Sequence, residues 1–274
     1  KIVISPSGKR IFNMNLNGKT LLLTGATGGI GKLVAQRLDA AGACIVLSCY
    51  LPDALAELSA ELNGNHVVVC ADVSSEQGRE AIVSACAGAG GIDGIVNLAG
   101  ILDFALFAQQ EVGLLERMIT INLAAPILLT RLLLDQLTSR DEAVILNVGS
   151  IFGSIGHPGF TAYCATKAGL MRFTEALSRE LADTPVRVAY IAPRATKTSL
   201  NDDRVNALNK ELGNKSDNPE LVADQIVAML ENNSVVEYLG WPEKLFVKIN
   251  ALLPGVVGSA LIKNLSKIKH YARR

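Results

Sequence analysis

The sequence lacks the features that mark several classes of protein. Lys and Arg number 26 and Asp and Glu number 26, so the chain has no net charge at pH 7. Nucleic-acid-binding domains are usually basic, so this balance speaks against a nucleic-acid partner. The five cysteines contain no Cys-x-x-Cys pair, and no metal site is expected from them. We interpret them as small core residues of a protein in a reducing compartment: Cys44, Cys49, Cys70, Cys86 and Cys164.

Long hydrophobic runs are also scarce. The longest apolar stretch, residues 118–130, contains Asn122 and Pro126 and stops before Arg131. A membrane-spanning helix needs about 20 apolar residues, so we expect this stretch to be too short and too polar to cross a bilayer. No secretory signal is visible. The sequence therefore predicts a cytoplasmic protein.

The chain instead alternates short β-branched runs with longer helical patterns. Seven runs are expected as strands: 20–24, 44–48, 66–70, 94–97, 143–148, 186–191 and 235–239. Helical patterns cover residues 31–41, 53–62, 75–87, 112–137 and 162–181. Several strands are apolar throughout, as in sheets covered on both faces. The alternation predicts a single-domain α/β fold: a doubly wound parallel sheet of the Rossmann type, with about seven strands and helices on both faces.

The motifs divide the chain into three parts. Residues 18–240 are the expected dinucleotide-binding and catalytic domain, and residues 1–17 are an N-terminal extension without a recognisable motif. Residues 241–274 form an expected helical tail with a basic end. Its apolar residues recur at helical spacing: Leu245, Phe246, Ile249, Leu252 and Leu253.

A glycine-rich turn, Thr24-Gly25-Ala26-Thr27-Gly28-Gly29-Ile30-Gly31, follows the first expected strand. Gly25 allows a tight turn, Gly29 lets a pyrophosphate approach the backbone, and Gly31 lets helix and strand pack closely. The start of the next helix supplies free N–H groups and the positive end of a dipole. The turn predicts a dinucleotide site, with a ligand-free turn as the alternative.

Tyr163 and Lys167 are four positions apart in an expected helix, so their side chains share one face. A free tyrosine has a pKa near ~10 and is a poor base at neutral pH. A nearby cation lowers that pKa, and Lys167 can supply the charge. This tuning suits general acid–base catalysis.

In order and spacing, these motifs resemble those of the short-chain dehydrogenase/reductase family over roughly residues 18–239. The turn matches the family's Thr-Gly-x-x-x-Gly-x-Gly. The run Asn97-Leu98-Ala99-Gly100 is similar to its Asn-Asn-Ala-Gly, with Leu98 in place of the second Asn. Ser150 lies 13 residues before Tyr163, and Asn122 lies 28 residues before Ser150, as the family's other two catalytic residues do.

The resemblance implies a role for each catalytic residue. Tyr163 transfers a proton to or from the substrate oxygen, and Lys167 lowers its pKa and binds the nicotinamide ribose. Ser150 polarises the carbonyl, and Asn122 holds a water in a proton relay. The implied cofactor-binding residues are Gly25, Thr27, Gly29, Ile30, Gly31, Tyr50, Asp72, Val73, Asn97, Ala99, Gly100, Tyr163, Lys167, Pro193, Thr196 and Thr198.

Four regions leave alternatives open. Asp72 contacts the adenine in the family's manner or caps a helix or turn. His157 touches substrate or only packs in its loop. Arg194 stands where many members have glycine, and we expect it to bind an anionic group of the substrate, to close on the cofactor, or to be solvated. The tail is loosely similar to those of retinol- and steroid-type members. It covers the pocket, pairs subunits, lies on a membrane surface as a peripheral contact, or is a solvated end.

The cofactor is predicted to be NADP or NAD. The residues after the second strand, Ser48-Cys49-Tyr50-Leu51, include no acid to repel a 2′-phosphate, which favours NADP. We predict an NAD(P)-dependent oxidoreductase that interconverts a carbonyl and a primary or secondary alcohol on a small, lipophilic substrate, as a homodimer or homotetramer. The alternatives are a non-catalytic dinucleotide-binding sensor or scaffold, and an epimerase or dehydratase that uses bound cofactor.

Overall fold

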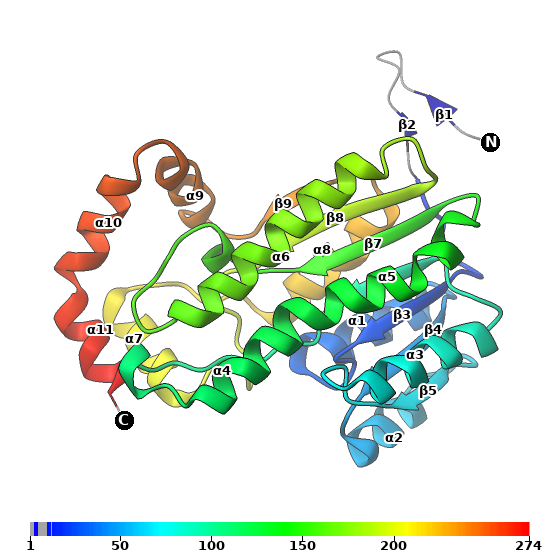
Figure 1. The fold of residues 1–274 in the computed structure, drawn as a ribbon, viewed down its shortest axis with the longest axis horizontal. Coiled ribbons are helices and arrows are strands. Elements are labelled where there is room, and N and C mark those ends of the chain that lie inside the picture. The colour runs from blue at the N-terminus through cyan, green and yellow to red at the C-terminus, as the bar shows by residue number, and fades with distance from the viewer. Residues whose placement is uncertain (1–2, 5–9, 12, 274) are drawn as a thin grey trace.

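The computed structural model describes residues 3–4, 10–11 and 13–273. Seven parallel strands form the central sheet in the order β5-β4-β3-β6-β7-β8-β9 (Figure 1). They are β3 (Thr20–Thr24), β4 (Cys44–Cys49), β5 (Val67–Cys70), β6 (Gly94–Asn97), β7 (Ala143–Val148), β8 (Val186–Ala192) and β9 (Val236–Tyr238). The predicted doubly wound α/β fold is confirmed, and each predicted strand end lies within one residue of the observed one.

The strand order reverses at β3, which pairs with β4 on one side and β6 on the other. The central strands are apolar because both of their faces are covered; Leu21, Leu22 and Leu23 of β3 are completely buried. In such a sheet the crevice beyond the strand ends at the reversal is the natural ligand site. The glycine turn leaves β3 at this place.

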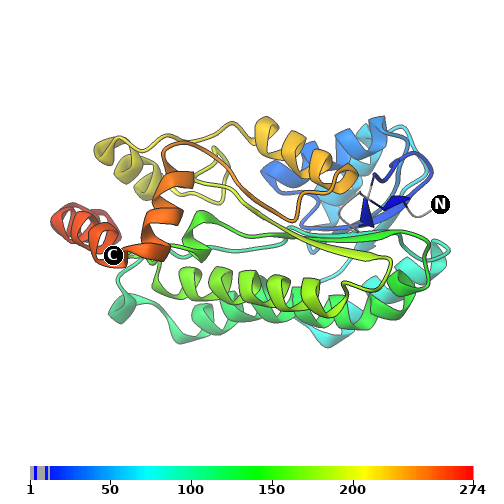
Figure 2. The ribbon, with the colours of Figure 1, turned by 90° about the horizontal axis from the view of Figure 1, so that it is seen from above.

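Helices cover both faces of the sheet (Figure 2). One layer holds α1 (Gly29–Ala40), α2 (Pro52–Glu61) and α8 (Pro219–Glu231), and the other holds α3 (Glu76–Gly88), α5 (Ala125–Thr138) and α6 (Thr161–Glu180). Leu38 and Ile226 belong to the first hydrophobic core, and Ile82 and Leu133 belong to the second. Helices α7 (Asp203–Leu212) and α8 were not predicted.

Helix α4 (Val112–Ile119) continues into α5 through a π-helical turn, Thr120–Ala124. The whole segment, Val112–Thr138, has 27 residues and a mean hydropathy of 1.6 in its most apolar window. It is therefore longer than the stretch predicted from sequence, and by length and composition alone it could cross a membrane. A core helix passes the same test, and this helix packs Leu129 and Leu133 against the sheet.

The N-terminal extension contains a feature that the sequence did not reveal. Strands β1 (Val3–Ile4) and β2 (Arg10–Ile11) form an antiparallel pair. Downstream, Met14 and Leu16 are buried in the first core, and the Met14 amide donates to the carbonyl of Glu231 at 3.0 Å. The end of the extension therefore packs as part of the main domain.

The residues after β9 form three helices: α9 (Glu243–Leu252), α10 (Pro254–Lys263) and α11 (Leu265–Ala272). We call residues 241–273 the arm. In Figure 1 the arm (brown to red) leaves the sheet, turns down along one end of the molecule and returns beside α7. Ile268 and Ala272 of α11 are buried in a cluster with Phe104 and Val205, so the far end of the arm is anchored to the domain.

The cysteines only partly match their interpretation as core residues. Cys49, Cys86 and Cys164 are buried, but Cys44 is half-buried and Cys70 is exposed. Cys70 lies on β5, the edge strand of the sheet, where one side has no neighbour. Within residues 3–4, 10–11 and 13–273, no three His, Cys, Asp or Glu side chains come together as a metal site.

Candidate active site

The glycine turn is shaped by close backbone contacts. Gly25 has a φ of 68°, and a Cβ there would lie 2.9 Å from Cα of Ala99. A Cβ on Gly31 would lie 2.2 Å from the carbonyl oxygen of Gly25, so only glycine lets α1 start this close to β3. Helix α1 has no side-chain cap at Gly28. Its first amides are therefore available to a phosphate.

The loop after β6 is held against this turn. The hydroxyl of Thr24 accepts hydrogen bonds from the amides of Leu98 (3.1 Å) and Ala99 (3.2 Å). On the other side, Thr198 stands 3.0 Å from the position of a Cβ on Gly29. The two loops and the turn therefore enclose a narrow cradle beyond β3 and β6.

One cavity of about 920 Å³ runs from this cradle to the arm. Most of the predicted site residues line it: Gly25, Thr27, Gly29, Ile30, Gly31, Tyr50, Asp72, Val73, Ala99, Gly100, Ser150, Tyr163, Lys167, Pro193, Thr196 and Thr198. Val205 and Leu212 also line it, as does Arg117, which the sequence did not single out.

Two predicted residues, Asn97 and Asn122, are not among the residues that line this cavity. Asn97 was expected to bind cofactor, but its side chain is buried and donates to the Asn147 side chain at 2.8 Å. Asn147 in turn donates to Thr174 of α6 at 2.9 Å. The role of the Asn97 side chain is thus to join β6, β7 and α6, because a polar group buried in the sheet needs a partner.

Asn122 sits in the π-helical turn and holds the loop after β6. Its side-chain oxygen accepts from the amide of Ile101, and its nitrogen donates to the carbonyl of Ile101, both at 2.8 Å. A Cβ on Gly100 would lie 3.3 Å from the Asn122 oxygen and 3.7 Å from Nζ of Lys167. Asn122 and Lys167 therefore both lie close to Gly100 and to each other. The proposed role of Asn122 in holding a water for a proton relay stays a prediction.

Tyr163 and Lys167 lie on one face of α6, with the ammonium nitrogen 5.8 Å from the centre of the tyrosine ring. Lys167 donates to the carbonyl of Val148 at the end of β7 (3.0 Å). Ser150 follows that strand, and its hydroxyl accepts from the amide of Phe152 (3.1 Å). Helix α6 and the β7 loop thus bring together the three residues that the sequence placed in one catalytic set.

Tyr190 supports Ser150 and was missed from the sequence. Its hydroxyl accepts from the amide of Ser150 at 3.3 Å, and its ring is almost completely buried. A Cβ on Gly149 would lie 2.0 Å from this ring, so glycine is required before the catalytic serine. In the sequence, Tyr190 lies within an apolar strand and is indistinguishable from the other core residues. No known spacing connects it to Ser150.

Burial controls the pKa values of the two central groups. It raises the pKa of Tyr163 to about 12, although a hydrogen bond with Ser150 acts in the lowering direction. It lowers the pKa of Lys167 to about 8. Desolvation of the phenolate therefore dominates the pKa of Tyr163. The prediction that Lys167 acts to lower this pKa stays a prediction.

The end of the cavity beside β4 contains an unpartnered polar group. The buried hydroxyl of Ser48 lines the cavity and has no hydrogen-bond partner in the described part of the chain. Asp72 also lines it, but one carboxylate oxygen accepts from the amide (2.9 Å) and hydroxyl (2.7 Å) of Ser74. Asp72 thus caps a turn, as the alternative interpretation held. The glycine cradle, the free amides and the unpartnered hydroxyl fit a dinucleotide.

An aromatic cluster lies beside Tyr163. The rings of Phe104 and Phe160 stack at 4.6 Å, and Phe152 lies 4.9 Å from Phe160. His157 packs 5.0 Å from Phe152 and also lines the cavity. Burial lowers the pKa of His157 despite its contact with the carbonyl of Pro158, which favours the neutral ring. The cluster therefore presents a largely uncharged surface.

The arm supplies the far wall of the same cavity. Phe246 and Ile249 of α9 and Val256, Val257 and Leu261 of α10 all line it. The helical spacing of the tail marked Phe246 and Ile249 as apolar face residues. It could not show which way that face turns, because the turn at Leu253 and Pro254 sets the direction of α10.

Arg194 fastens the root of the arm. Its guanidinium pairs with Asp217 at 2.6 Å and Glu243 at 2.9 Å, and donates to the carbonyl of Trp241 at 3.0 Å. The side chain is 12% exposed. The charge of Arg194 is satisfied within the protein, so the solvated alternative is wrong. Arg194 also lines the cavity, and its contact with substrate or cofactor stays a prediction. We call these four residues the Arg194 clasp.

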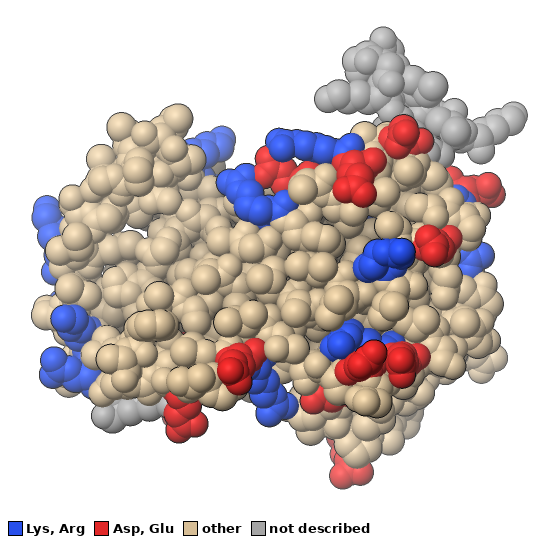
Figure 3. Space-filling view, in the orientation of Figure 1, with Lys and Arg blue, Asp and Glu red and all other residues tan. Residues whose placement is uncertain are grey.

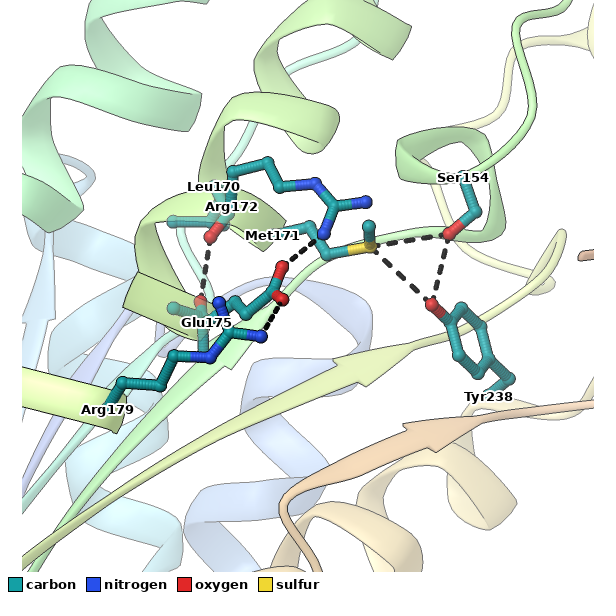
Figure 4. A network of polar contacts seen from close by, with 8 residues as sticks. Ser154, Leu170, Met171, Arg172, Glu175, Arg179 and Tyr238 are labelled. Atoms are coloured by element: carbon teal, nitrogen blue, oxygen red, sulfur yellow. Dashed lines mark hydrogen bonds and ion pairs between the residues drawn. The ribbon is translucent and has the colours of Figure 1, made fainter. Parts of the chain in front are cut away.

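Polar contacts join the loop after β7 to α6 and β9, next to the start of the arm. The hydroxyls of Ser154 and Tyr238 are 3.1 Å apart. Figure 4 shows the sulfur of Met171 beside both, and Glu175 between Arg172 and Arg179 on α6.

Two further contacts hold the arm itself. The carbonyl of the same Ser154 accepts from Asn250 of α9 at 2.9 Å. At the tip, Tyr271 donates to Glu211 of α7 at 2.7 Å.

Comparison with known proteins places this site in a family. The model of the short chain dehydrogenase family matches residues 19–209. Nodulation protein G of Rhizobium sp. (strain N33) is 32% identical over 230 residues, which cover 82% of this chain and 94% of that protein. The 3-oxoacyl-[acyl-carrier-protein] reductase FabG of Vibrio cholerae is 31% identical over 235 residues, covering 85% and 94%.

Solved structures agree. The 3-ketoacyl-(acyl-carrier-protein) reductase of Brucella melitensis, complexed with NADH, superimposes with a TM-score of 0.74 at 27% identity, covering 81% of this chain and 96% of that one. A short chain dehydrogenase of Burkholderia cenocepacia in complex with NADP has the same fold, with a TM-score of 0.77 at 21% identity, covering 90% and 99%.

The chain belongs to the short-chain dehydrogenase family. It is an NAD(P)-dependent oxidoreductase that acts on a small-molecule carbonyl or alcohol. The family match ends at residue 209, so the arm lies beyond it.

Proposed function

We propose that this enzyme interconverts long, apolar carbonyl compounds and their alcohols. The observation that supports this proposal is the shape of the cavity. It joins the cofactor cradle to a space, here called the chamber, that is lined by the aromatic cluster and the inner face of the arm. A long hydrocarbon chain gains free energy in proportion to the apolar surface it buries, so such a chamber favours extended apolar substrates.

The proposed chemistry uses the residues at the end of β7 and on α6. Ser150 donates a hydrogen bond to the substrate oxygen and stabilises charge that develops there. In reduction, Tyr163 gives its proton to that oxygen; in oxidation, it takes the proton back. Lys167, held by Val148, keeps a positive charge beside the phenol. When bound, the nicotinamide cofactor supplies or accepts the hydride.

We propose NADP as the preferred cofactor. Cys49 ends β4 and lines the cavity, and Tyr50 beyond it is 57% exposed. No carboxylate stands there to repel a 2′-phosphate. Titration of the purified protein with NADPH and NADH, followed by fluorescence, tests this preference; tighter binding of NADH would contradict it.

The substrate proposal is tested with a series of aldehydes or ketones of increasing chain length. We expect kcat/KM for NADPH oxidation to rise with chain length, and turnover of only small polar carbonyls would overturn the proposal. Tyr163→Phe should abolish turnover while cofactor binding persists. Tyr271→Phe, which removes a hydroxyl from the arm tip, is the matched control and should keep nearly full turnover.

We also propose that the enzyme works in the cytoplasm as a homodimer or homotetramer, with only peripheral membrane contact. The outer face of α4 and α5 supports a subunit contact, since it exposes Val112, Ile119, Leu128 and Leu132 by 42% to 69%. Light scattering coupled to size exclusion gives the mass in solution. A monomer at micromolar concentration would contradict the assembly.

A further inference from the structure

The arm carries a charge that the rest of the chain does not share. Residues 241–274 hold seven Lys or Arg residues and a single acid, Glu243, in a chain whose totals are 26 and 26. The preceding 240 residues therefore hold 19 basic and 25 acidic residues. Glu243 is already paired with Arg194. In Figure 3, Lys and Arg side chains lie along the left edge of the molecule, where Figure 1 places the arm.

Between these basic residues the arm exposes large apolar side chains. Leu252 is 80% exposed, Ile262 68% and Leu253 61%. These three are not among the residues that line the cavity of the described chain. In α9, Leu245, Lys248 and Leu252 follow one another at helical spacing and share a face. The arm thus has an inner apolar face toward the cavity and an outer face where leucine and lysine alternate.

We propose that this outer face docks the enzyme on an anionic lipid bilayer. Apolar side chains flanked by lysines suit the boundary between headgroups and acyl chains, and anionic headgroups attract the lysines. Lys248, Lys263 and Lys269 are exposed, and among residues 13–273 no carboxylate lies within ion-pair distance of them. A twofold contact between two such faces would bring basic residues together, so a second copy is the poorer partner.

The docking surface is already ordered in the free protein. The Arg194 clasp holds the root of the arm, Asn250 its middle, and Tyr271 its tip. Binding therefore does not have to order a disordered segment, which would weaken it. Because both faces belong to the same helices, the docked enzyme has the far wall of its chamber directly behind the lipid contact. The docking itself does not depend on the proposed substrate.

The test mixes the full-length protein with two kinds of vesicle: phosphatidylcholine alone, and equal parts phosphatidylcholine and phosphatidylglycerol. We expect the protein to sediment with the anionic vesicles only, and to be released at high salt. Trp241 is the single tryptophan and is 66% exposed at the root of the arm. Its emission should shift to shorter wavelength when the arm enters the interface.

Two sets of variants separate the charge from the apolar contribution. Reversal of Lys248, Lys263 and Lys269 to Glu should weaken binding to anionic vesicles at least about a hundredfold. Leu252→Ser with Leu253→Ser should weaken binding while its salt dependence stays. None of these residues belongs to the active site, so turnover of a short, soluble carbonyl should be unchanged.

The matched control reverses three basic residues outside the arm that are also solvent-accessible and, among residues 13–273, have no carboxylate at ion-pair distance: Lys32, Arg131 and Lys197. It should bind vesicles as the wild type does. Equal binding to neutral and anionic vesicles, or an equal loss in this control, would overturn the proposal. The proposal would also be overturned if the wild type did not bind vesicles and the leucine variants formed a smaller assembly. That result would identify the arm as a subunit contact. Failure of the proposed enzyme activity is distinguished from failure of docking by a separate assay, in which no carbonyl compound would oxidise NADPH.

Discussion

The burial of the Arg194 clasp sets how much stability the protein should lose when the clasp is broken. Among the described residues, Arg194 carries the only charge that pairs with Asp217 and Glu243, whose side chains are 10% and 19% exposed, and Arg194→Met removes it. The second oxygen of Asp217 is buried and has no partner in the described residues, so the loss leaves this carboxylate without a compensating charge. Breaking a buried pair typically costs about 3–5 kcal/mol.

We take the lower end, about 3 kcal/mol, because Glu243 keeps some contact with water. For a protein of this size, 1 kcal/mol lowers the melting temperature by about 2–4 °C, so Arg194→Met should melt about 6–12 °C lower. Thermal unfolding followed by circular dichroism measures this. The double variant Arg194→Met with Asp217→Asn should regain a large part of the loss, because it no longer leaves that carboxylate ionised and buried.

The arm gives an independent readout. The carbonyl of Trp241 accepts from Arg194, so release of the clasp should change the fluorescence of this single tryptophan before the domain unfolds. Loss of activity should be larger for long carbonyls than for short ones, because the arm walls only the far end of the cavity. A destabilisation below about 1 kcal/mol, or strictly additive effects of the two substitutions, would refute the reasoning.

Three further predictions follow from the cradle and the buried lysine. Gly31→Ala should abolish tight cofactor binding in a fluorescence titration, because its Cβ would lie 2.2 Å from the carbonyl of Gly25; unchanged affinity would contradict the close packing. Cys49→Asp should lower the NADPH-to-NADH ratio of kcat/KM at least about tenfold, since a carboxylate there repels the 2′-phosphate. The pKa of Lys167 is lowered to about 8 by burial, so the unfolded chain binds more protons than the folded one between pH ~8 and ~10.5. The free energy of unfolding of the wild type, relative to that of Lys167→Met, should therefore rise with pH across that window in denaturant titrations. A difference that does not change with pH would show that burial does not lower the pKa of Lys167.

The layered fold and the core of the site were predictable because they depend on local patterns. Buried parallel strands are apolar runs, and the turn between β3 and α1 needs glycine at fixed positions. Tyr163 and Lys167 share a face by helical geometry alone. Ser150 was identified from the family spacing, and the structure places its side chain beside Tyr163 as expected.

The features that were missed depend on contacts between distant segments. Arg194 reads as a loop charge until the chain brings Asp217 and Glu243 to it. Asn97 matches a motif, yet its side chain bonds to Asn147 on the next strand. Burial raises the pKa of Tyr163, and the sequence did not reveal this because it shows neighbouring charges but not how completely a side chain is buried.

The position of the arm separates two properties of the enzyme along its chain. Every residue proposed for proton transfer or cofactor binding precedes residue 200, whereas the proposed substrate wall and the proposed lipid-facing surface come after residue 240. We therefore expect substitutions in the last 34 residues to change which molecules the enzyme accepts, and from where, and to leave hydride transfer intact. For protein engineering, we expect that the arm can be exchanged between related domains if the Arg194 clasp is transferred with it.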